Sequence, residues 1–277
     1  MGQIACANVL SDLYAFGITH VDNILMIMGV PCEMSGEERD IVLGLLRDGF
    51  KESATLAGAS IRGGDTKINA WLMFGGVATS VVKSPDIIRP QNAKVGDGIL
   101  LTKPLGTHLA TTLYRWTADV EKMASINSVI TKSDIEVSYN IALNSMTHLN
   151  RTAASLMHLF DAHAATDITG YGLIGHAETL VKYQNESVDF VIDKLPIIKN
   201  MLKVDKFLNN KFKLMDGRAI ETSGGLFICL PLENVDKFQN ALREIDNWES
   251  WLIGHVVEGN RQVTLVDQQE LTIVDVG

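Results

Sequence analysis

The order of hydrophobic and polar positions along the chain predicts both helices and strands. Residues 2–16 are expected to form a first helix that is apolar nearly all round and therefore buried, and Gly17 is expected to end it. A second helix is expected to begin at the capping-box sequence of residues 35–38 and to reach Ala57. Strands are predicted over residues 22–30, 71–82, 99–102, 162–166, 188–192, 226–230, 251–257, 262–266 and 271–274. Since this order has no strict strand–helix–strand repeat, we expect an α+β fold.

The second half of the chain carries further helical patterns. One helix is expected to start near Pro104. Directly before it, Lys103 could meet an anion, although a lysine in such a place is more often solvated. Another is expected to begin at a capping-box pattern in residues 133–136 and to run, with a break near Asn150, to Phe160. The other helical patterns cover residues 171–182, a basic helix or loop at 196–209 with a solvated face, and residues 234–245.

Asp12 is a carboxylate on the otherwise apolar first helix, one turn after Asn8 on the same face. A buried carboxylate needs a hydrogen bond, a proton or a metal ion. From the residues alone, a metal-binding Asp12 and a partly exposed Asp12 with local hydrogen bonds are both open.

Asp167 follows a strand of small residues and precedes the helix predicted over residues 171–182. The N-terminus of a helix has free N–H groups and the positive end of the helix dipole, so this position suits a phosphate or a metal ion that carries one. The alternative is that Asp167 or Thr169 simply caps the helix. The histidines His148, His158 and His163 lack metal-ligand spacing and are expected to be structural or at the surface.

Gly63, Gly64, Asp65 and Thr66 form a short sequence that would let the backbone approach a ligand closely, although most such tetrapeptides are turns. Together with Asp12 and Asp167, this segment suggests a magnesium-nucleotide enzyme, because hard oxygen ligands favour Mg²⁺ and sparsely ligated Mg²⁺ usually carries nucleotide phosphates. There is no P-loop sequence.

Length and composition narrow the classes of protein. A chain of 277 residues is long enough for two domains, and the polar, turn-rich residues 85–98 predict a boundary between domains of residues 1–95 and 96–277. The net charge of −9 argues against a nucleic-acid partner. The sequence has no run of 18 apolar residues, so no membrane span is predicted, and no signal peptide is recognisable. The three separated cysteines fit reduced thiols in a cytoplasmic protein.

Five motifs occur in an order that resembles selenophosphate synthetases (selenide, water dikinases), in particular those of eukaryotes. They are Ile-Ala-Cys-Ala-Asn-Val-Leu-Ser-Asp-Leu-Tyr-Ala at residues 4–15, Leu-Thr-Lys-Pro-Leu-Gly at 101–106, Leu-Asn-Arg-Thr-Ala-Ala at 149–154, Ala-His-Ala-Ala-Thr-Asp-Ile-Thr-Gly at 162–170 and Glu-Thr-Ser-Gly-Gly at 221–225. The resemblance covers essentially the whole chain. It implies a two-domain aminoimidazole ribonucleotide synthetase-like fold and a homodimer. The implied reaction converts ATP, selenide and water into selenophosphate, AMP and phosphate, which supplies selenium for selenocysteine synthesis.

The resemblance also implies roles for the singled-out residues. Asp12 matches a Mg²⁺ ligand that also helps to hold ATP, and Asp167 matches another Mg²⁺ ligand. The segment of Gly63, Gly64, Asp65 and Thr66 matches one that contacts ATP from the partner subunit. Many relatives have histidine or glutamine where this chain has Asp65, so an ATP contact is least secure there.

The family's catalytic lysine and its cysteine or selenocysteine are expected upstream of residue 1, so no catalytic residue is assigned in this chain. We therefore expect an incomplete N-terminal domain and a chain that lacks selenophosphate synthesis. A non-catalytic paralogue with a regulatory or scaffolding role is the alternative. Another member of the superfamily, such as a purine-biosynthesis enzyme, is disfavoured by the motifs at 101–106 and 162–170 taken together.

Overall fold

The computed structural model describes residues 1–268 and 270–277. Its helices are α1 (Gly2–Ala15), α2 (Gly36–Leu56), α3 (Thr107–Trp116), α4 (Val120–Ile126), α5 (Lys132–Thr147), α6 (Arg151–Leu159), α7 (Gly172–Lys182), α8 (Met201–Phe207) and α9 (Val235–Asp246), with 3₁₀ turns at Ser84–Asp86 and Leu232–Asn234. Its strands are β1 (Asn23–Pro31), β2 (Ile61–Asn69), β3 (Met73–Thr79), β4 (Asp97–Leu101), β5 (Ala164–Asp167), β6 (Val188–Ile192), β7 (Lys194–Ile198), β8 (Leu226–Pro231), β9 (Trp251–Glu258), β10 (Val263–Leu265) and β11 (Thr272–Val276). The predicted mixture of helices and strands is confirmed.

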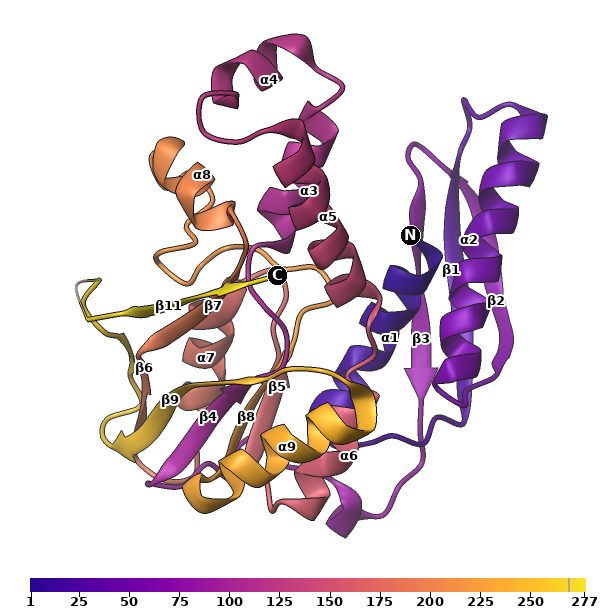
Figure 1. The fold of residues 1–277 in the computed structure, drawn as a ribbon. Coiled ribbons are helices and arrows are strands. Elements are labelled where there is room, and N and C mark those ends of the chain that lie inside the picture. Colours follow the sequence, from indigo (N-terminus) through magenta and orange to yellow (C-terminus); the bar gives the residue numbers. More distant parts are fainter. Residues whose placement is uncertain (269) are drawn as a thin grey trace.

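The first three strands form a sheet of their own, in the order β2-β1-β3 (Figure 1). β2 runs parallel to β1, and β3 runs antiparallel to it. Gly63 to Thr66 therefore lie inside an edge strand, and their interpretation as a turn is wrong. A side chain at Gly64 would overlap the backbone of Met26 on β1, so close approach of the strands explains this glycine.

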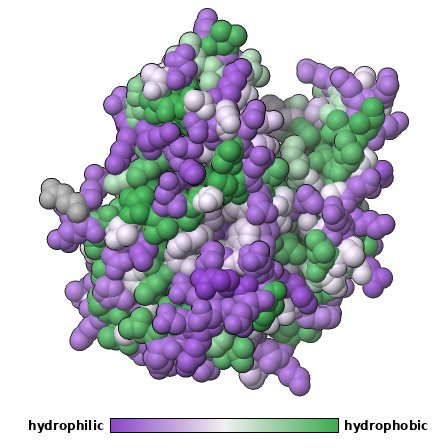
Figure 2. All heavy atoms as spheres, viewed as in Figure 1, coloured by the Kyte–Doolittle hydropathy of each residue, from purple (hydrophilic) through white to green (hydrophobic). Residues whose placement is uncertain are grey.

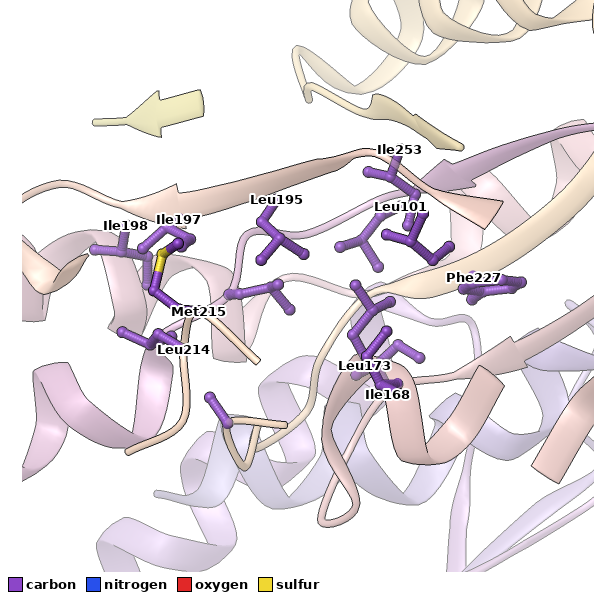
Figure 3. Close-up of a cluster of buried hydrophobic side chains, with 14 of the residues drawn as sticks. Leu101, Ile168, Leu173, Leu195, Ile197, Ile198, Leu214, Met215, Phe227 and Ile253 are labelled. Carbon is purple, nitrogen blue, oxygen red and sulfur yellow. The ribbon is translucent and has the colours of Figure 1, made fainter. Parts of the chain in front are cut away.

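The larger sheet has six strands in the order β10-β6-β9-β4-β8-β5, and β11 pairs separately with β7. All five residues of β4 are buried. Leu101, Phe227 and Ile253, from three neighbouring strands, pack in one hydrophobic cluster with Ile168 and Leu173 (Figure 3). This cluster anchors the segment that directly follows Asp167.

Helix α1 lies between the two sheets and contacts α2 and β3 on one side and β5, α5 and α6 on the other (Figure 1). Leu10 and Tyr14 are fully buried, as expected for a helix that is apolar nearly all round. A side chain at Gly2 would overlap the backbone at Leu46, so the small residue permits close packing against α2. Gly17 has a φ of +74°, which confirms its predicted role in ending the helix.

Two predicted helix starts need correction. The capping box of α5 is formed by Thr131 and Asp134, whereas the sequence pattern placed it at residues 133–136. Both patterns fit a helix start, but the hydroxyl group of Thr131 accepts the N–H of Asp134, so the helix begins at Lys132. Helix α3 begins at Thr107, beyond Pro104, because Leu105 is still extended and bridges to Ile197.

The segment over residues 196–209 is neither one helix nor a loop. It starts as the end of β7, turns at Asn200 with a φ of +70°, and continues as the short helix α8. The two helices α5 and α6 are separated at residues 148–150, which confirms the predicted break near Asn150. The second-helix prediction is also confirmed, because Ser35 and Glu38 form a capping box at the start of α2.

The surface mixes hydrophobic and hydrophilic residues, and a notch separates the lobe of α3, α4 and α5 from the lobe of α2 (Figure 2). Among the described residues, none of the helices has the length and apolar character that a membrane crossing requires.

Candidate functional site

Asp12 and Asp167 line the same cleft, although the two residues are 155 positions apart in the sequence. Asp12 projects from the exposed side of α1, and Asp167 is the last residue of β5. The cleft has a volume of about 500 Å³. Its other lining residues come from the end of α1, the segment before β4, and α7: Ala15, Phe16, Pro90, Gln91, Ala165, Thr166, His176, Thr179, Leu180, Tyr183 and Asn185.

The two carboxylates repel each other. Partial burial and the nearby charge of Asp167 raise the pKa of Asp12 above its ordinary value. The charge of Asp167 also acts on two basic groups beside the cleft, Lys103 and His176. A cation in the cleft would relieve the repulsion between Asp12 and Asp167, so the electrostatics favour a positively charged ligand.

The segment after Asp167 is held by His176. The backbone N–H of Thr169 donates to Nε2 of His176 at 3.0 Å, so Nδ1 of this imidazole carries the proton. Burial lowers the pKa of His176, which keeps the ring neutral. Tyr171 is the N-cap of α7 and makes no side-chain capping bond. Neither Asp167 nor Thr169 therefore caps α7, so the helix-cap alternative is wrong.

A buried polar layer lies next to this segment. Lys103 is only 1% exposed, so its interpretation as a solvated lysine is wrong. Its Nζ donates to the carbonyl oxygens of His148 at 2.7 Å and Ser223 at 2.8 Å. Burial lowers the pKa of Lys103 to about 7, although the charge of Asp167 acts in the opposite direction.

Glu221 is buried at the N-terminus of α3. Its carboxylate accepts the N–H groups of Gly106 at 2.6 Å and Thr107 at 3.0 Å, and it also accepts the hydroxyl group of Thr107. Burial raises the pKa of Glu221 to about 7, against the effect of these hydrogen bonds. Neither Lys103 nor Glu221 was predicted to be buried, because the burial of one charged residue between two elements does not show in the hydrophobic pattern. The sequence signal that could have indicated it is that both residues lie in family motifs, at 101–106 and 221–225.

The three histidines are structural, as predicted. His148 stacks on Trp248 with ring centres 3.7 Å apart and pairs with Asp246. His158 Nε2 lies 2.9 Å from the carbonyl oxygen of Gly17. His163 Nδ1 donates to the buried carboxylate of Asp97 at 2.8 Å, and its Nε2 lies 3.0 Å from Lys94 Nζ. This last cluster was not found by sequence reasoning.

The segment of Gly63 to Thr66 does not line the cleft within one chain. It lies on the exposed edge strand β2, where Asp65 makes an ion pair with Lys67 at 3.1 Å. Both side chains of this pair are solvent-exposed. The structure therefore brings Asp12 and Asp167 together and leaves the predicted nucleotide segment apart from them.

The donor set suits Mg²⁺ in part. Two carboxylates facing one cleft are hard oxygen ligands, and magnesium sites commonly combine one or two carboxylates with water and phosphate oxygens. Within residues 1–268 and 270–277, no cluster of three or more His, Cys, Asp or Glu side chains could hold a metal ion by itself. A metal bound here would thus take most of its ligands from other sources.

Comparison with known proteins shows which family and which relatives the chain is similar to. Residues 94–267 match the family described as AIR synthase related protein, C-terminal domain. The chain is 46% identical to selenide, water dikinase 3 of Danio rerio over 98% of the chain and 64% of that protein. It is 45% identical to selenide, water dikinase 2 of Homo sapiens over 97% of the chain and 60% of that protein. It therefore spans less than two thirds of the length of these two relatives.

Solved structures agree on the fold. Thiamine-monophosphate kinase from Stenotrophomonas maltophilia K279a superposes with a TM-score of 0.72 at 22% identity, over 95% of this chain and 77% of that one. The hydrogenase maturation protein HypE of E. coli gives 0.73 at 17% identity, over 98% and 77%. The expected AIR synthase-like α+β fold is confirmed.

Selenide, water dikinase 2 of Drosophila melanogaster is 47% identical over 94% of this chain and 72% of its own length. With that coverage and the family match at residues 94–267, this chain belongs to the selenide, water dikinase family, among the proteins related to AIR synthase.

Proposed function

We propose that the protein is a selenide, water dikinase, which converts ATP, selenide and water into selenophosphate, AMP and phosphate. The observation that carries this proposal is the cleft shared by Asp12 and Asp167, two residues from separate motifs of the family. The relatives that are named selenide, water dikinase support the same activity. The product would supply selenium for selenocysteine synthesis.

Mg²⁺ is the proposed metal, with Asp12 and Asp167 among its ligands. When bound, Mg²⁺ supplies positive charge that neutralises the phosphates during transfer. The chain's own contribution is to hold the two carboxylates. His176 accepts the N–H of Thr169, and the carbonyl oxygen of Gly225 accepts the N–H of Ile168 at 2.9 Å. These two bonds fix the backbone directly after Asp167, so that its carboxylate meets the cation without reorganisation.

ATP contact by Gly63, Gly64, Asp65 and Thr66 is proposed to come from the partner subunit of a homodimer. The exposure of β2 and its position at the edge of its sheet support an approach by a second chain. In the single chain, the ion pair with Lys67 offsets the charge of Asp65, which would reduce repulsion of phosphate. Domains of residues 1–95 and 96–277, and a cytoplasmic location with free Cys6, Cys32 and Cys229, complete the proposal.

The test is an anaerobic assay with ATP and Mg²⁺, with and without selenide, on the protein at its full natural length and on residues 1–277 alone. Selenophosphate is followed by ³¹P NMR and AMP by chromatography. From the protein at its full natural length we expect AMP only when selenide and Mg²⁺ are both present, and loss of this activity in Asp167→Asn. From residues 1–277 alone we expect no selenide-dependent AMP. Binding of Mg²⁺ and ATP by the protein at its full natural length, without any selenide-dependent AMP, would refute the enzyme and favour the non-catalytic paralogue.

A further inference from the structure

One segment without helix or strand, residues 88–93, connects the helix that carries Asp12 with the helix that follows Asp167. We call this segment the strap. At its first end, the N–H of Ile88 donates to the carbonyl oxygen of Phe16, at the end of α1, at 2.9 Å. At its other end, the N–H of Ala93 donates to Oε1 of Gln184, just beyond α7, at 2.8 Å. The strap is therefore attached to both sides of the cleft.

Gln184 makes most of the attachment on the α7 side. Its side chain is buried, and its Nε2 donates to the carbonyl oxygens of Pro90 and Leu180, each at 2.8 Å. With the bond from Ala93, one amide group thus makes three hydrogen bonds, two to the strap and one to α7. The neighbouring Asn185 adds a backbone bond to Gln91 at 2.9 Å.

The strap is also part of the cleft itself. Pro90 and Gln91 line the cleft together with Asp12 and Asp167. A change in the path of the strap would move this wall, and it would also shift the end of α1 relative to α7, because Ile88 and Ala93 are fixed to these two elements.

We infer that Gln184 is a positioning residue that sets the spacing of α1 and α7 through the strap, and thereby the geometry of the Asp12–Asp167 pair. The part that concerns cation binding rests on the proposed function. Outer residues that orient metal ligands typically change metal affinity by about 10- to 100-fold when they are replaced. Gln184 lies one step further out, so we expect an effect near the lower limit.

The chemistry of the site requires an amide at position 184. One atom must accept the N–H of Ala93 while the other donates to two carbonyl groups. Methionine has a similar length but makes none of these bonds, whereas glutamate keeps the acceptor and loses both donated bonds. Gln184→Met therefore removes all three hydrogen bonds of the side chain, and Gln184→Glu removes two of them. Glutamate also adds a buried charge, so methionine is the primary variant.

Gln239 offers a matched control. Its Nε2 donates to the carbonyl oxygen of Ser250 at 2.6 Å, away from the cleft, so Gln239→Met also removes a partly buried glutamine bond. A general loss of stability would affect both methionine variants, whereas a change in cleft geometry would affect only the variant at Gln184.

The first measurement is the distance between spin labels at the exposed positions Asn8 of α1 and Lys182 of α7, in a Cys32→Ser background. We expect a narrow distribution in the parent and in Gln239→Met, and a broader or shifted one in both Gln184→Met and Gln184→Glu. Unchanged distributions in the Gln184 variants would overturn the inference, whether or not the protein binds a metal ion.

The second measurement is the dissociation constant for Mn²⁺, used as a spectroscopic probe for Mg²⁺. We expect it to rise about tenfold in Gln184→Met and to stay within twofold in Gln239→Met. An equal affinity in Gln184→Met and the parent would refute the link to the carboxylates. Absence of Mn²⁺ binding in the parent would refute the proposed metal site, while the label distances would still decide the role of Gln184.

Discussion

The ammonium nitrogen of Lys103 lies 2.8 Å from the carbonyl oxygen of Ser223, in a position closed to solvent. This bond joins the segment after β4 to the segment before β8. Two residues further on, Gly225 contacts the backbone of Lys103 and accepts the N–H of Ile168. Ile168 directly follows Asp167, so a buried lysine supports the backbone that presents the candidate metal ligand.

The two buried ionisable groups predict an unusual dependence of stability on pH. For Glu221 the folded pKa of about 7 is above the unfolded value of 4.5, so its contribution to stability is present below pH 4.5 and lost as pH rises to about 7. For Lys103 the folded pKa of about 7 is below the unfolded value of 10.5. Its contribution to stability is therefore absent below about pH 7, where the buried amine is charged, and it increases as pH rises from about 7 to 10.5. Together these groups lower the free energy of unfolding most near pH 7.

Urea unfolding at pH 5, 7 and 9 measures this effect. At 1.36 kcal/mol per pKa unit, Glu221 accounts for on the order of 3 kcal/mol between pH 4.5 and 7. In Glu221→Gln this fall should be reduced, and in Lys103→Met the rise above pH 7 should be reduced. If each variant follows the same pH profile as the parent, displaced by a constant, the burial of these charges does not control the stability.

The contact between Gly225 and Lys103 predicts that a methyl group will not fit. In Gly225→Ala the added Cβ would overlap the backbone nitrogen of Lys103, and neither backbone can move freely inside the core. We expect a loss of about 1–3 kcal/mol in the free energy of unfolding, as is typical of overpacking. Gly170→Ala is the matched control, because no atom lies within 4 Å of its added Cβ. Similar unfolding temperatures for the two variants would show that the 221–225 segment adapts.

Much of the architecture could be predicted because it depends on patterns of several residues. The buried first helix, the capping box at Ser35 and the alternating strands all have such patterns, and these predictions are confirmed. The motif residues Asp12 and Asp167 were also expected to act together, and they share a cleft. Their contact with Gly63 to Thr66 depends on a second chain and stays a prediction.

Single-residue features were harder to predict. Lys103 is buried where the separate segments of His148 and Ser223 meet it, and nothing adjacent to it in the sequence signals their approach. The pair of His163 and Asp97 is separated by 66 positions, and the bonds of Gln184 to the strap span more than 90. Such contacts follow from the path of the chain in space, which hydrophobic periodicity does not specify.

The repulsion in the cleft predicts opposite effects of one change on binding and on stability. Asp12→Asn or Asp167→Asn removes one carboxylate, so we expect Mn²⁺ affinity to fall at least tenfold. Because partial burial and the neighbouring charge of Asp167 raise the pKa of Asp12, the metal-free protein should become slightly more stable at pH 7. Since much of the Asp12 side chain remains open to solvent, this gain should stay below about 1 kcal/mol.

Calorimetric titration with Mn²⁺ and thermal unfolding in a chelator measure these two quantities. Asp48→Asn on the exposed side of α2 is the control, because it removes one negative charge outside this cleft. An equal loss of affinity in all three variants would indicate a general charge effect, and the pair would then have no special role as ligands.

The corrected start of α5 predicts different results for two neighbouring hydroxyl residues. Thr131 accepts the N–H of Asp134 at 3.1 Å, and Asp134 accepts the N–H of Thr131 at 3.2 Å, so Thr131→Ala removes the helix cap. We expect it to lower the free energy of unfolding by about 1 kcal/mol. Ser133 lies in the first turn and is exposed, so Ser133→Ala should change stability by less than about 0.5 kcal/mol. Chemical unfolding of both variants decides between the two boundaries, because a larger loss in Ser133→Ala would restore the helix start expected at residues 133–136.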